Sequence, residues 1–248
     1  MEGSMARARG VAVVLVLGVL GGRAFGDADG DRLLAQVDQA LDRAQTQSIE
    51  YRVVTGKPPG GERALALEAR LKSGKWRFEF TAPEDLKGTR LLVLSTGERY
   101  VVLPAFGNRV RRIAANADRS FMELAYGVAE LRLRWGDDYS AAIASQTASQ
   151  LELTLTPKEG RSPLYAKVKL TIDKKLMLPT RIESFDAAGA RSKTETRAGY
   201  SCQGEVCTAA EHKLVDHVTQ ATTTLTRGKW TANAPIDDEV FTVRGLAQ

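Results

Sequence analysis

From residue 48 onward, the chain is dominated by short segments in which apolar and polar residues alternate. The two clearest segments are residues 65–71 and 76–80, which a Ser-Gly pair separates. In the second segment, aromatic residues alternate with charged ones, so that Trp76, Phe78 and Phe80 fall on one side. Because successive side chains of a strand point to opposite faces, this pattern predicts a hairpin of an antiparallel sheet with one apolar and one charged face.

One amphipathic helix, over residues 29–45, precedes the strands. Leu34, Val37 and Leu41 recur at helical spacing, and acidic residues occupy the other side. A helix that packs on a sheet and a helix that plugs an open barrel fit this pattern equally well, because both need one apolar face.

Further strands follow from the same two-residue period, with Gly, Pro and Asp at the turns. Residues 191–197 are polar throughout, which suits an edge or outer strand. Residues 118–139 carry mixed signals, and we expect a short helix or a loop there. The absence of a strand–helix–strand rhythm favours one strongly curved antiparallel sheet of about ten or eleven strands. The predicted strands are residues 49–54, 65–71, 76–80, 91–94, 100–103, 109–113, 151–155, 166–172, 178–185, 191–197 and 212–226, and residues 241–243 at the tail are a further candidate.

Residues 1–26 have the pattern of a secretory signal peptide. Arg7 and Arg9 precede an apolar run over residues 11–20 that is too short to span a bilayer. No cysteine follows this run as a site of lipid attachment. We therefore predict export and cleavage, leaving one domain over residues 27–248 free in its compartment; a retained N-terminal anchor is the alternative.

The composition is that of an ordinary globular protein: 248 residues, 43% apolar and 26% charged, with a formal net charge of +5. The basic residues do not form a stripe with interleaved aromatic residues, which argues against nucleic-acid binding. The two cysteines, Cys202 and Cys207, flank a turn that contains glycine. In an exported protein this spacing favours a structural disulfide over a redox or metal-binding pair.

The sequence contains no recognisable catalytic motif. A nucleophile elbow, a metalloprotease helix, a phosphate-binding loop and a dinucleotide fingerprint are all missing from it. The two histidines, His212 and His217, lie five apart in a predicted strand, so they point to opposite faces and do not share a metal. We expect both to face solvent, and we predict neither an enzyme nor a cofactor.

The stretch from Pro83 to Met122 carries a set of short motifs whose order is more informative than any one of them. Its members are Pro83-x-Asp85-x-Lys87-Gly88-Thr89, Leu103-Pro104-Ala105, Arg109-Val110-Arg111-Arg112-Ile113 and Ser120-Phe121-Met122. Together with later motifs such as Ile172-Asp173, Leu178-Pro179 and Phe241-Thr242, this set resembles the LolA-like outer-membrane lipoprotein-sorting family of bacteria, over nearly all of the chain after the leader.

The resemblance implies a fold, a location and a role. The fold would be a mainly β, incomplete antiparallel barrel of the LolA/LolB type, half open, with an N-terminal helix and a short mid-chain helical plug. The role would be that of a monomeric periplasmic carrier, without a cofactor, which shelters the acyl chains of lipoproteins or other lipids. Its partners would be an inner-membrane exporter and an outer-membrane acceptor. The alternative is a non-carrying periplasmic subunit that docks on an inner-membrane exporter of the RND type or on an envelope complex.

We place the candidate lipid-binding residues on one face of the first half of the sheet, chosen by strand parity. The aromatic residues of this face suit a cavity wall and a closed core equally well. The arginines near residue 110 are either a solvated surface or a rim that contacts a phosphate, a carboxylate or a partner. The candidate lipid-binding residues are Trp76, Phe78, Phe80, Leu91, Val93, Val101, Leu103, Phe121 and Met122, and the candidate rim residues are Arg109, Arg111 and Arg112.

Overall fold

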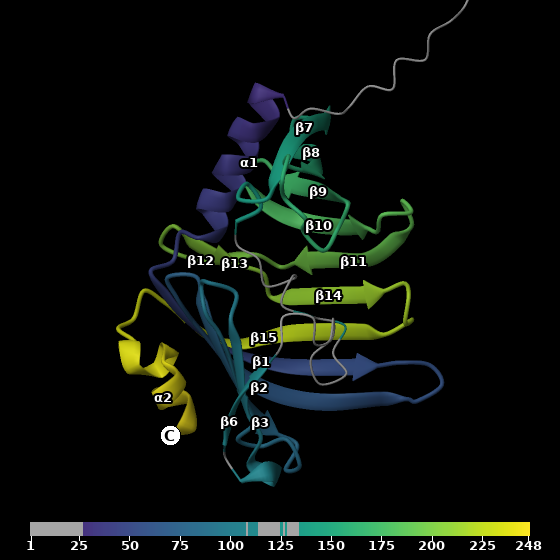
Figure 1. Cartoon of the computed structure of the whole chain (residues 1–248). Coiled ribbons are helices and arrows are strands. Elements are labelled where there is room, and N and C mark those ends of the chain that lie inside the picture. The colour runs from purple at the N-terminus through teal and green to yellow at the C-terminus, as the bar shows by residue number, and fades with distance from the viewer. Residues whose placement is uncertain (1–26, 108, 114–124, 126, 128–133) are drawn as a thin grey trace, which may run out of the picture.

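The architecture is known from a computed structural model, which describes residues 27–107, 109–113, 125, 127 and 134–248. One antiparallel sheet of thirteen strands dominates it, in the order β6-β5-β4-β3-β2-β1-β15-β14-β11-β10-β9-β8-β7 (Figure 1). The strands are β1 (Thr46–Gly56), β2 (Glu62–Lys72), β3 (Lys75–Ala82), β4 (Arg90–Val93), β5 (Arg99–Val102), β6 (Val110–Ile113), β7 (Tyr139–Gln146), β8 (Gln150–Pro157), β9 (Lys167–Asp173), β10 (Leu178–Phe185), β11 (Arg191–Ala198), β14 (Glu211–Asp216) and β15 (Thr222–Ala232).

The strand order shows how the chain builds this sheet. From β1 it proceeds by hairpins to β6 at one end, and it resumes at β7 at the other end. Hairpins then lead back towards the centre, where β15 pairs with β1. The strands β6 and β7 do not pair, so the sheet is open. This confirms the predicted mainly β, antiparallel fold at the level of an open curved sheet.

The helix α1 (Ala28–Leu41) covers one face of the sheet at the β7–β10 end (Figure 1). We call this face the inner face. Leu34 and Val37 of the helix are buried among strand residues that include Leu153 and Leu170. The apolar side chains of β8 and β9 on this face pack against the apolar side of α1, and the burial of both surfaces stabilises this end of the sheet.

Two aspartates of the N-terminal region also complete the edge of the sheet. The backbone N–H of Ala141 on β7 donates to Asp31 Oδ1 at 2.7 Å, and that of Ile143 donates to Asp27 Oδ2 at 3.2 Å. The backbone N–H of Asp27 donates in turn to the carbonyl of Ala141. These contacts occupy edge groups that would otherwise be open to pairing with another strand.

The C-terminal segment covers the opposite, outer face at the other end of the sheet. A 3-10 turn, η3 (Asp238–Phe241), leads into the short helix α2 (Val243–Ala247). Phe241 and Leu246 pack against Leu92 and Val102. The prediction of a strand over residues 241–243 was therefore wrong. Thr242 begins a helix instead, because its hydroxyl accepts a hydrogen bond from the Gly245 N–H.

The sequence had indicated an edge or outer strand over residues 191–197, but this segment is β11, in the interior of the sheet between β10 and β14. Its Lys193 and Glu195 are buried. The predicted strand 212–226 is two strands with a turn between them, and β7 was not predicted at all. With the small hairpin β12 (Ser201–Gln203) and β13 (Val206–Thr208), the described residues form fifteen strands, more than the ten or eleven expected.

The hairpin β12–β13 carries the predicted disulfide. Cys202 and Cys207 face each other in its register and are bonded. The side chain of Gln203 contacts β15 through the carbonyl of Trp230 and the N–H of Ala232, at 2.9 Å each. The bond therefore closes a small hairpin that lies against the main sheet, and the predicted disulfide is present.

The predicted signal peptide and most of the predicted mid-chain plug, residues 118–139, lie outside the described residues. Among those that are described, no helix has both the length and the apolar character needed to cross a bilayer.

Candidate functional site

Six of the predicted lipid-binding residues share one face of strands β3, β4 and β5. Trp76 pairs with Val93, Phe78 pairs with Leu91, and Leu91 pairs with Val101 on the next strand. Because residues that pair directly point to the same face, and so do residues two apart in a strand, these six form one surface. We call it the apolar wall; its members are Trp76, Phe78, Phe80, Leu91, Val93 and Val101.

The apolar wall belongs to the inner face. Cross-strand partners lead from Thr55 on β1 through Thr223, Leu214 and Glu195 to Ile182, which packs in the core beneath α1. Val53 lies two residues before Thr55 in β1 and therefore on the same face. Its partner on β2 is Leu65, which shares that face with Leu67 and with the partner of Leu67, Phe80. The wall and the α1-covered core are thus two parts of one continuous surface.

Most of the wall is closed, but two aromatic rings are not. Phe80, Leu91, Val93 and Val101 are buried, whereas Trp76 and Phe78 are half-buried. The rings of Trp76 and Phe78 stack with centroids 5.6 Å apart and planes 3° from parallel. A stacked pair of this kind is a rigid apolar surface with little conformational entropy to lose on contact with a ligand.

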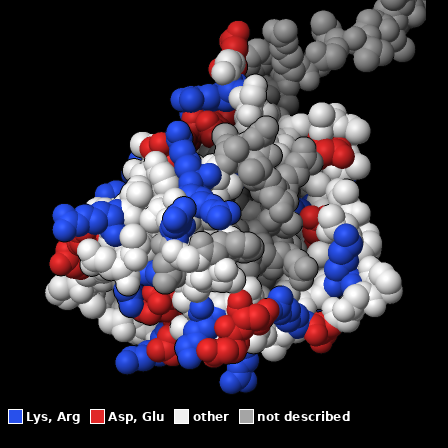
Figure 2. Space-filling view, turned by 60° about the horizontal axis from the view of Figure 1, so that its bottom comes forward, with Lys and Arg blue, Asp and Glu red and all other residues white. Residues whose placement is uncertain are grey.

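The remaining predicted residues are more scattered. Leu103 is half-buried, at the start of the 3-10 turn η1 (Pro104–Phe106). Phe121 and Met122 lie outside the described residues. Arg109, Arg111 and Arg112 are exposed at or beside β6, the end strand of the sheet, and Arg112 forms an ion pair of 2.8 Å with Glu98. Figure 2 shows basic and acidic side chains interspersed over the visible face rather than gathered in one basic patch.

A group of ionisable residues occupies the middle of the inner face, between the apolar wall and the core beneath α1. We call Glu195, Arg197 and His212 the polar centre. Arg197 Nε donates to Glu195 Oε1 at 2.7 Å, and His212 Nδ1 lies 3.1 Å from the same oxygen. The side chain of Glu195 is 3% exposed and that of Arg197 is 11% exposed. Such a pair is costly to bury, so its position between two apolar regions of the inner face makes it a candidate for a role other than packing.

The electrostatics of the polar centre follow from burial and from Arg197. Burial alone would raise the pKa of Glu195, but the charge of Arg197 and the hydrogen bond from His212 lower it to about 2. Burial lowers the pKa of His212, and Arg197 adds to that effect, although Glu195 opposes it. Burial also raises the pKa of neighbouring Tyr51 to about 12. At neutral pH Glu195 is therefore ionised, while His212 and Tyr51 are neutral.

Next to the polar centre, the inner face holds Ala125 by both of its backbone groups. The Ala125 N–H donates to Thr223 Oγ1 at 2.9 Å, and its carbonyl accepts from Lys193 Nζ at 2.6 Å. The hydroxyl of Thr223 also lies 2.9 Å from that of Thr55. Lys193, Thr223 and Thr55 are all buried, so the chain at Ala125 is fixed on this part of the sheet.

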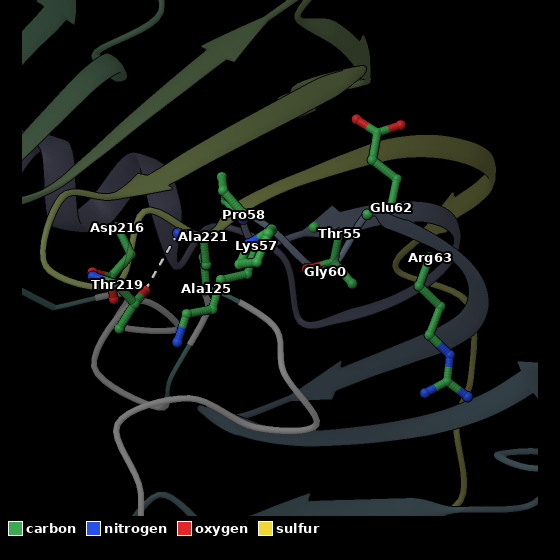
Figure 3. Close-up of a pocket in the computed structure, with 13 residues that line it drawn as sticks. Thr55, Lys57, Pro58, Gly60, Glu62, Arg63, Ala125, Asp216, Thr219 and Ala221 are labelled. Atoms are coloured by element: carbon green, nitrogen blue, oxygen red, sulfur yellow. Dashed lines mark hydrogen bonds between the residues drawn. The ribbon is translucent and has the colours of Figure 1, made fainter.

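A pocket of about 560 Å³ opens beside Ala125, where the β1–β2 and β14–β15 hairpins end (Figure 3). Asp216 shapes one wall by accepting from the backbone N–H groups of Val218 and Thr219. The volume of the pocket falls within the usual range of about 300–1,000 Å³ for small-molecule sites. The lining consists largely of small and polar residues: Thr55, Gly56, Lys57, Pro58, Pro59, Gly60, Gly61, Glu62, Arg63, Ala125, Asp216, Thr219 and Ala221.

The sequence did not reveal the polar centre, and one of its predictions was wrong there. His212 and His217 do point to opposite faces: His217 Nε2 lies 2.9 Å from Thr194 Oγ1 on the outer face. His212, however, does not face solvent; its side chain is 17% exposed. One feature of the sequence could have indicated the polar centre: Lys193, Glu195 and Arg197 are two residues apart in a strand and therefore share one face.

The described residues contain no group of three or more His, Cys, Asp or Glu side chains that could hold a metal ion. The arrangement on the inner face suits non-covalent binding: an apolar surface, a polar group at its margin and an opening beside them.

Comparisons with known proteins agree with this fold. A family model described as "Uncharacterized protein" matches residues 73–248. The fold is similar to that of a DUF1329 family protein from Desulfovibrio piger, with a TM-score of 0.79 and 18% identity, over 88% of this chain and 98% of that one. No curated protein matches the chain significantly.

Two further solved structures carry descriptions that concern lipoproteins. An outer membrane lipoprotein-sorting protein domain from Vibrio parahaemolyticus matches with a TM-score of 0.76 and 22% identity, over 89% of this chain and 99% of that one. A LolA superfamily protein from Nitrosomonas europaea matches with a TM-score of 0.68 and 15% identity, over 86% and 97% respectively. The resemblance found in the sequence is thereby confirmed at the level of the fold.

Proposed function

The chain belongs to the uncharacterized-protein family whose model matches residues 73–248, and because it also has the LolA-type fold, we propose that it is a non-enzymatic carrier of acyl chains. Its cargo would be acylated proteins or other lipids, held on the inner face of the sheet. The leader at residues 1–26 would direct it to the periplasm, where it would act in the transport of lipoproteins towards the outer membrane.

The observation that carries this proposal is the apolar wall. Its two half-buried stacked rings, Trp76 and Phe78, continue into the buried side chains of Phe80, Leu91 and Val93. An acyl chain that lies along these rings would leave water and contact an already ordered surface. We place the cargo at this wall rather than beneath α1, where Leu34 and Val37 already occupy the inner face.

Physical chemistry explains why a carrier of this kind needs no covalent step. Each buried CH₂ group of an acyl chain contributes about 0.8 kcal/mol, so a single long chain that crosses water unprotected would cost on the order of 10 kcal/mol. An apolar surface removes most of that cost. Release then requires an acceptor that binds the chain more tightly, which is why we infer a donor and an acceptor in the two membranes.

Lipid retention and uptake test this proposal directly. The protein would be purified without detergent after export, extracted and analysed by mass spectrometry for acyl lipids, and it would be titrated with a fluorescent fatty acyl probe. We expect co-purifying lipid, and probe binding that the variant with Trp76→Ser and Phe78→Ser loses. The matched control is Tyr100→Ala, an aromatic truncation on the outer face of neighbouring β5. Lipid-free wild-type protein that takes up no probe would reject the carrier function.

The exposed arginines of β6 favour a second candidate function, docking on a partner. Arg109, Arg111 and Arg112 would then contact acidic groups of an inner-membrane exporter of the RND type without any lipid being carried. Reversal of all three charges should abolish co-purification with such an exporter and leave acyl probe uptake unchanged. If both properties survive the reversal, these arginines are only a solvated surface.

A further inference from the structure

The polar centre contains a hydrogen-bonding atom without a partner. His212 Nε2 is buried, and no side chain or backbone group in the described part of the structure hydrogen-bonds to it. Buried polar atoms in folded proteins are nearly always paired, so an unpaired one requires an explanation. The outer-face histidine, His217, is paired with Thr194 by the same ring nitrogen, which makes the contrast within one chain direct.

The neighbours of His212 decide what kind of partner this nitrogen would take. Glu195 Oε1 already accepts from Arg197, and an ionised carboxylate can only accept hydrogen bonds. The 3.1 Å contact between that oxygen and His212 Nδ1 therefore places the imidazole proton on Nδ1. In the neutral ring Nε2 is then an acceptor.

The charges around the ring keep it neutral. Burial and the positive charges of Arg197 on β11 and Arg227 on β15 oppose a second proton, and Glu195 favours one. The Tyr51 ring on β1 stands edge-on to the imidazole, with centroids 6.2 Å apart. An unpaired acceptor in this setting calls for a neutral donor, because the charges of Arg197 and Arg227 disfavour a cationic one and an ionised carboxylate has no hydrogen to donate.

We propose that His212 Nε2 accepts a hydrogen bond from an N–H or O–H group at the polar end of the cargo. This inference rests on the proposed carrier function, since it assumes that an acyl chain lies on the inner face. The cargo would then be an acyl chain linked to an amide N–H, as in an N-acylated peptide, or to a free hydroxyl, as in a glyceride. Acyl chains that end in a simple ester would bind less well.

Matched ligands separate these possibilities. The full mature protein would be titrated with an N-methyl amide of a long-chain fatty acid and with the N,N-dimethyl amide of the same acid, which lacks the N–H. A monoglyceride and its dimethyl ether form the corresponding hydroxyl pair. We expect the donor member of at least one pair to bind about tenfold more tightly, the size of one hydrogen bond to a buried acceptor. The pair that shows the preference identifies the source of the donor.

Two variants and one spectroscopic measurement connect the preference to His212. His212→Phe should bind both members of the pair equally, whereas His217→Phe should keep the tenfold preference. The ¹⁵N resonance of His212 Nε2 in the wild-type protein should shift with the donor ligand and not with its methylated counterpart. This measurement needs no substitution, so it stays decisive if His212→Phe fails to fold.

The outcomes are distinct. Equal binding of both members of each pair by the wild type, with an unshifted Nε2 resonance, overturns the role of His212 and leaves the carrier function standing. Failure of all four ligands to bind overturns the carrier function, and the inference falls with it. A preference that persists in His212→Phe assigns the donor contact to another residue and also overturns the inference.

Discussion

The two ends of the sheet are covered by helices on opposite faces. At the β7–β10 end, α1 covers the inner face, and Leu34 and Val37 complete a closed core. At the β3–β5 end, η3 and α2 cover the outer face instead, where Phe241 and Leu246 pack against the sheet. The inner face of that second end retains two half-buried aromatic rings.

The β7–β10 end therefore contributes a closed core to stability, whereas the β3–β5 end leaves part of its inner face accessible. A sheet end that is already covered on its outer face can leave its inner face partly open and still bury enough apolar surface to fold. The polar centre lies between the two ends, so it separates a core that packs against the protein's own helix from a wall that we propose packs against a ligand.

The largest effect is expected from a cavity in the α1-covered end. Leu153 is almost fully buried beneath α1, so Leu153→Ala should lower the free energy of unfolding by about 2–5 kcal/mol. Chemical denaturation monitored by tryptophan fluorescence measures this loss. Leu164→Ala, at an exposed position, is the control and should change stability by less than about 0.5 kcal/mol. Equal losses in the two variants would show that this end is not a closed core.

The polar centre should make stability depend on pH, with an effect of about 3 kcal/mol from Glu195. Its pKa is about 2 when folded and 4.5 ordinarily, so below pH 4.5 the unfolded chain binds the proton more readily. This stabilisation is fully present above pH 4.5 and disappears as the pH falls towards 2. His212, whose pKa is lowered by burial, should add a loss of stability that begins below pH 6.5.

Denaturation curves of the wild type and of Glu195→Gln between pH 7 and pH 2.5 would check this dependence. The variant should be less stable at pH 7, because Arg197 loses its charged partner, but its stability should vary less below pH 4.5. Two curves that run parallel through this range would contradict the assignment.

The sequence predicted the apolar face of strands β3 and β4 better than the polar middle of the sheet. Strand alternation placed Trp76, Phe78 and Leu91 on one face correctly, because packing against a core requires one apolar side. It failed for β11, because the alternating members Lys193, Glu195 and Arg197 are charged although they point inwards. Their burial depends on partners such as Ala125 and His212, which lie far away in the sequence.

The C-terminal segment failed for a different reason. Phe241 and the β-branched residues that follow it have strand character, but the local hydrogen bond of Thr242 and the close approach of Gly245 to Glu239 select a helix. The prediction of a single strand over residues 212–226 likewise overlooked a turn, in which Asp216 accepts hydrogen bonds from two backbone N–H groups. Both errors arise from side-chain caps that periodicity does not detect.

A smaller effect is expected from the outer layer. A Cβ at Gly245 would lie 2.0 Å from the backbone oxygen of Glu239, so Gly245→Ala must displace α2 or η3. We expect a loss of about 1–3 kcal/mol, as for other overpacked sites, with acyl probe binding unchanged. Thermal unfolding and probe titration measure the two quantities. If this variant lost probe binding and kept its stability, the outer face would belong to the ligand site and the contrast between the two faces would fail.

The smallest effect on stability, and the largest on binding, is expected from the half-buried pair of rings, Trp76 and Phe78. Phe78 is half-buried and stacks on Trp76, so Phe78→Ala should cost only about 1–2 kcal/mol, less than Leu153→Ala. Its affinity for an acyl probe should nevertheless fall about fivefold to tenfold, because several CH₂ groups lose their contact surface. Leu153→Ala should show the reverse: a large loss of stability and unchanged affinity at a temperature where it remains folded. If instead probe affinity fell in proportion to stability across both variants, the two ends would form a single core, and the division of the inner face into a closed part and a binding part would be wrong.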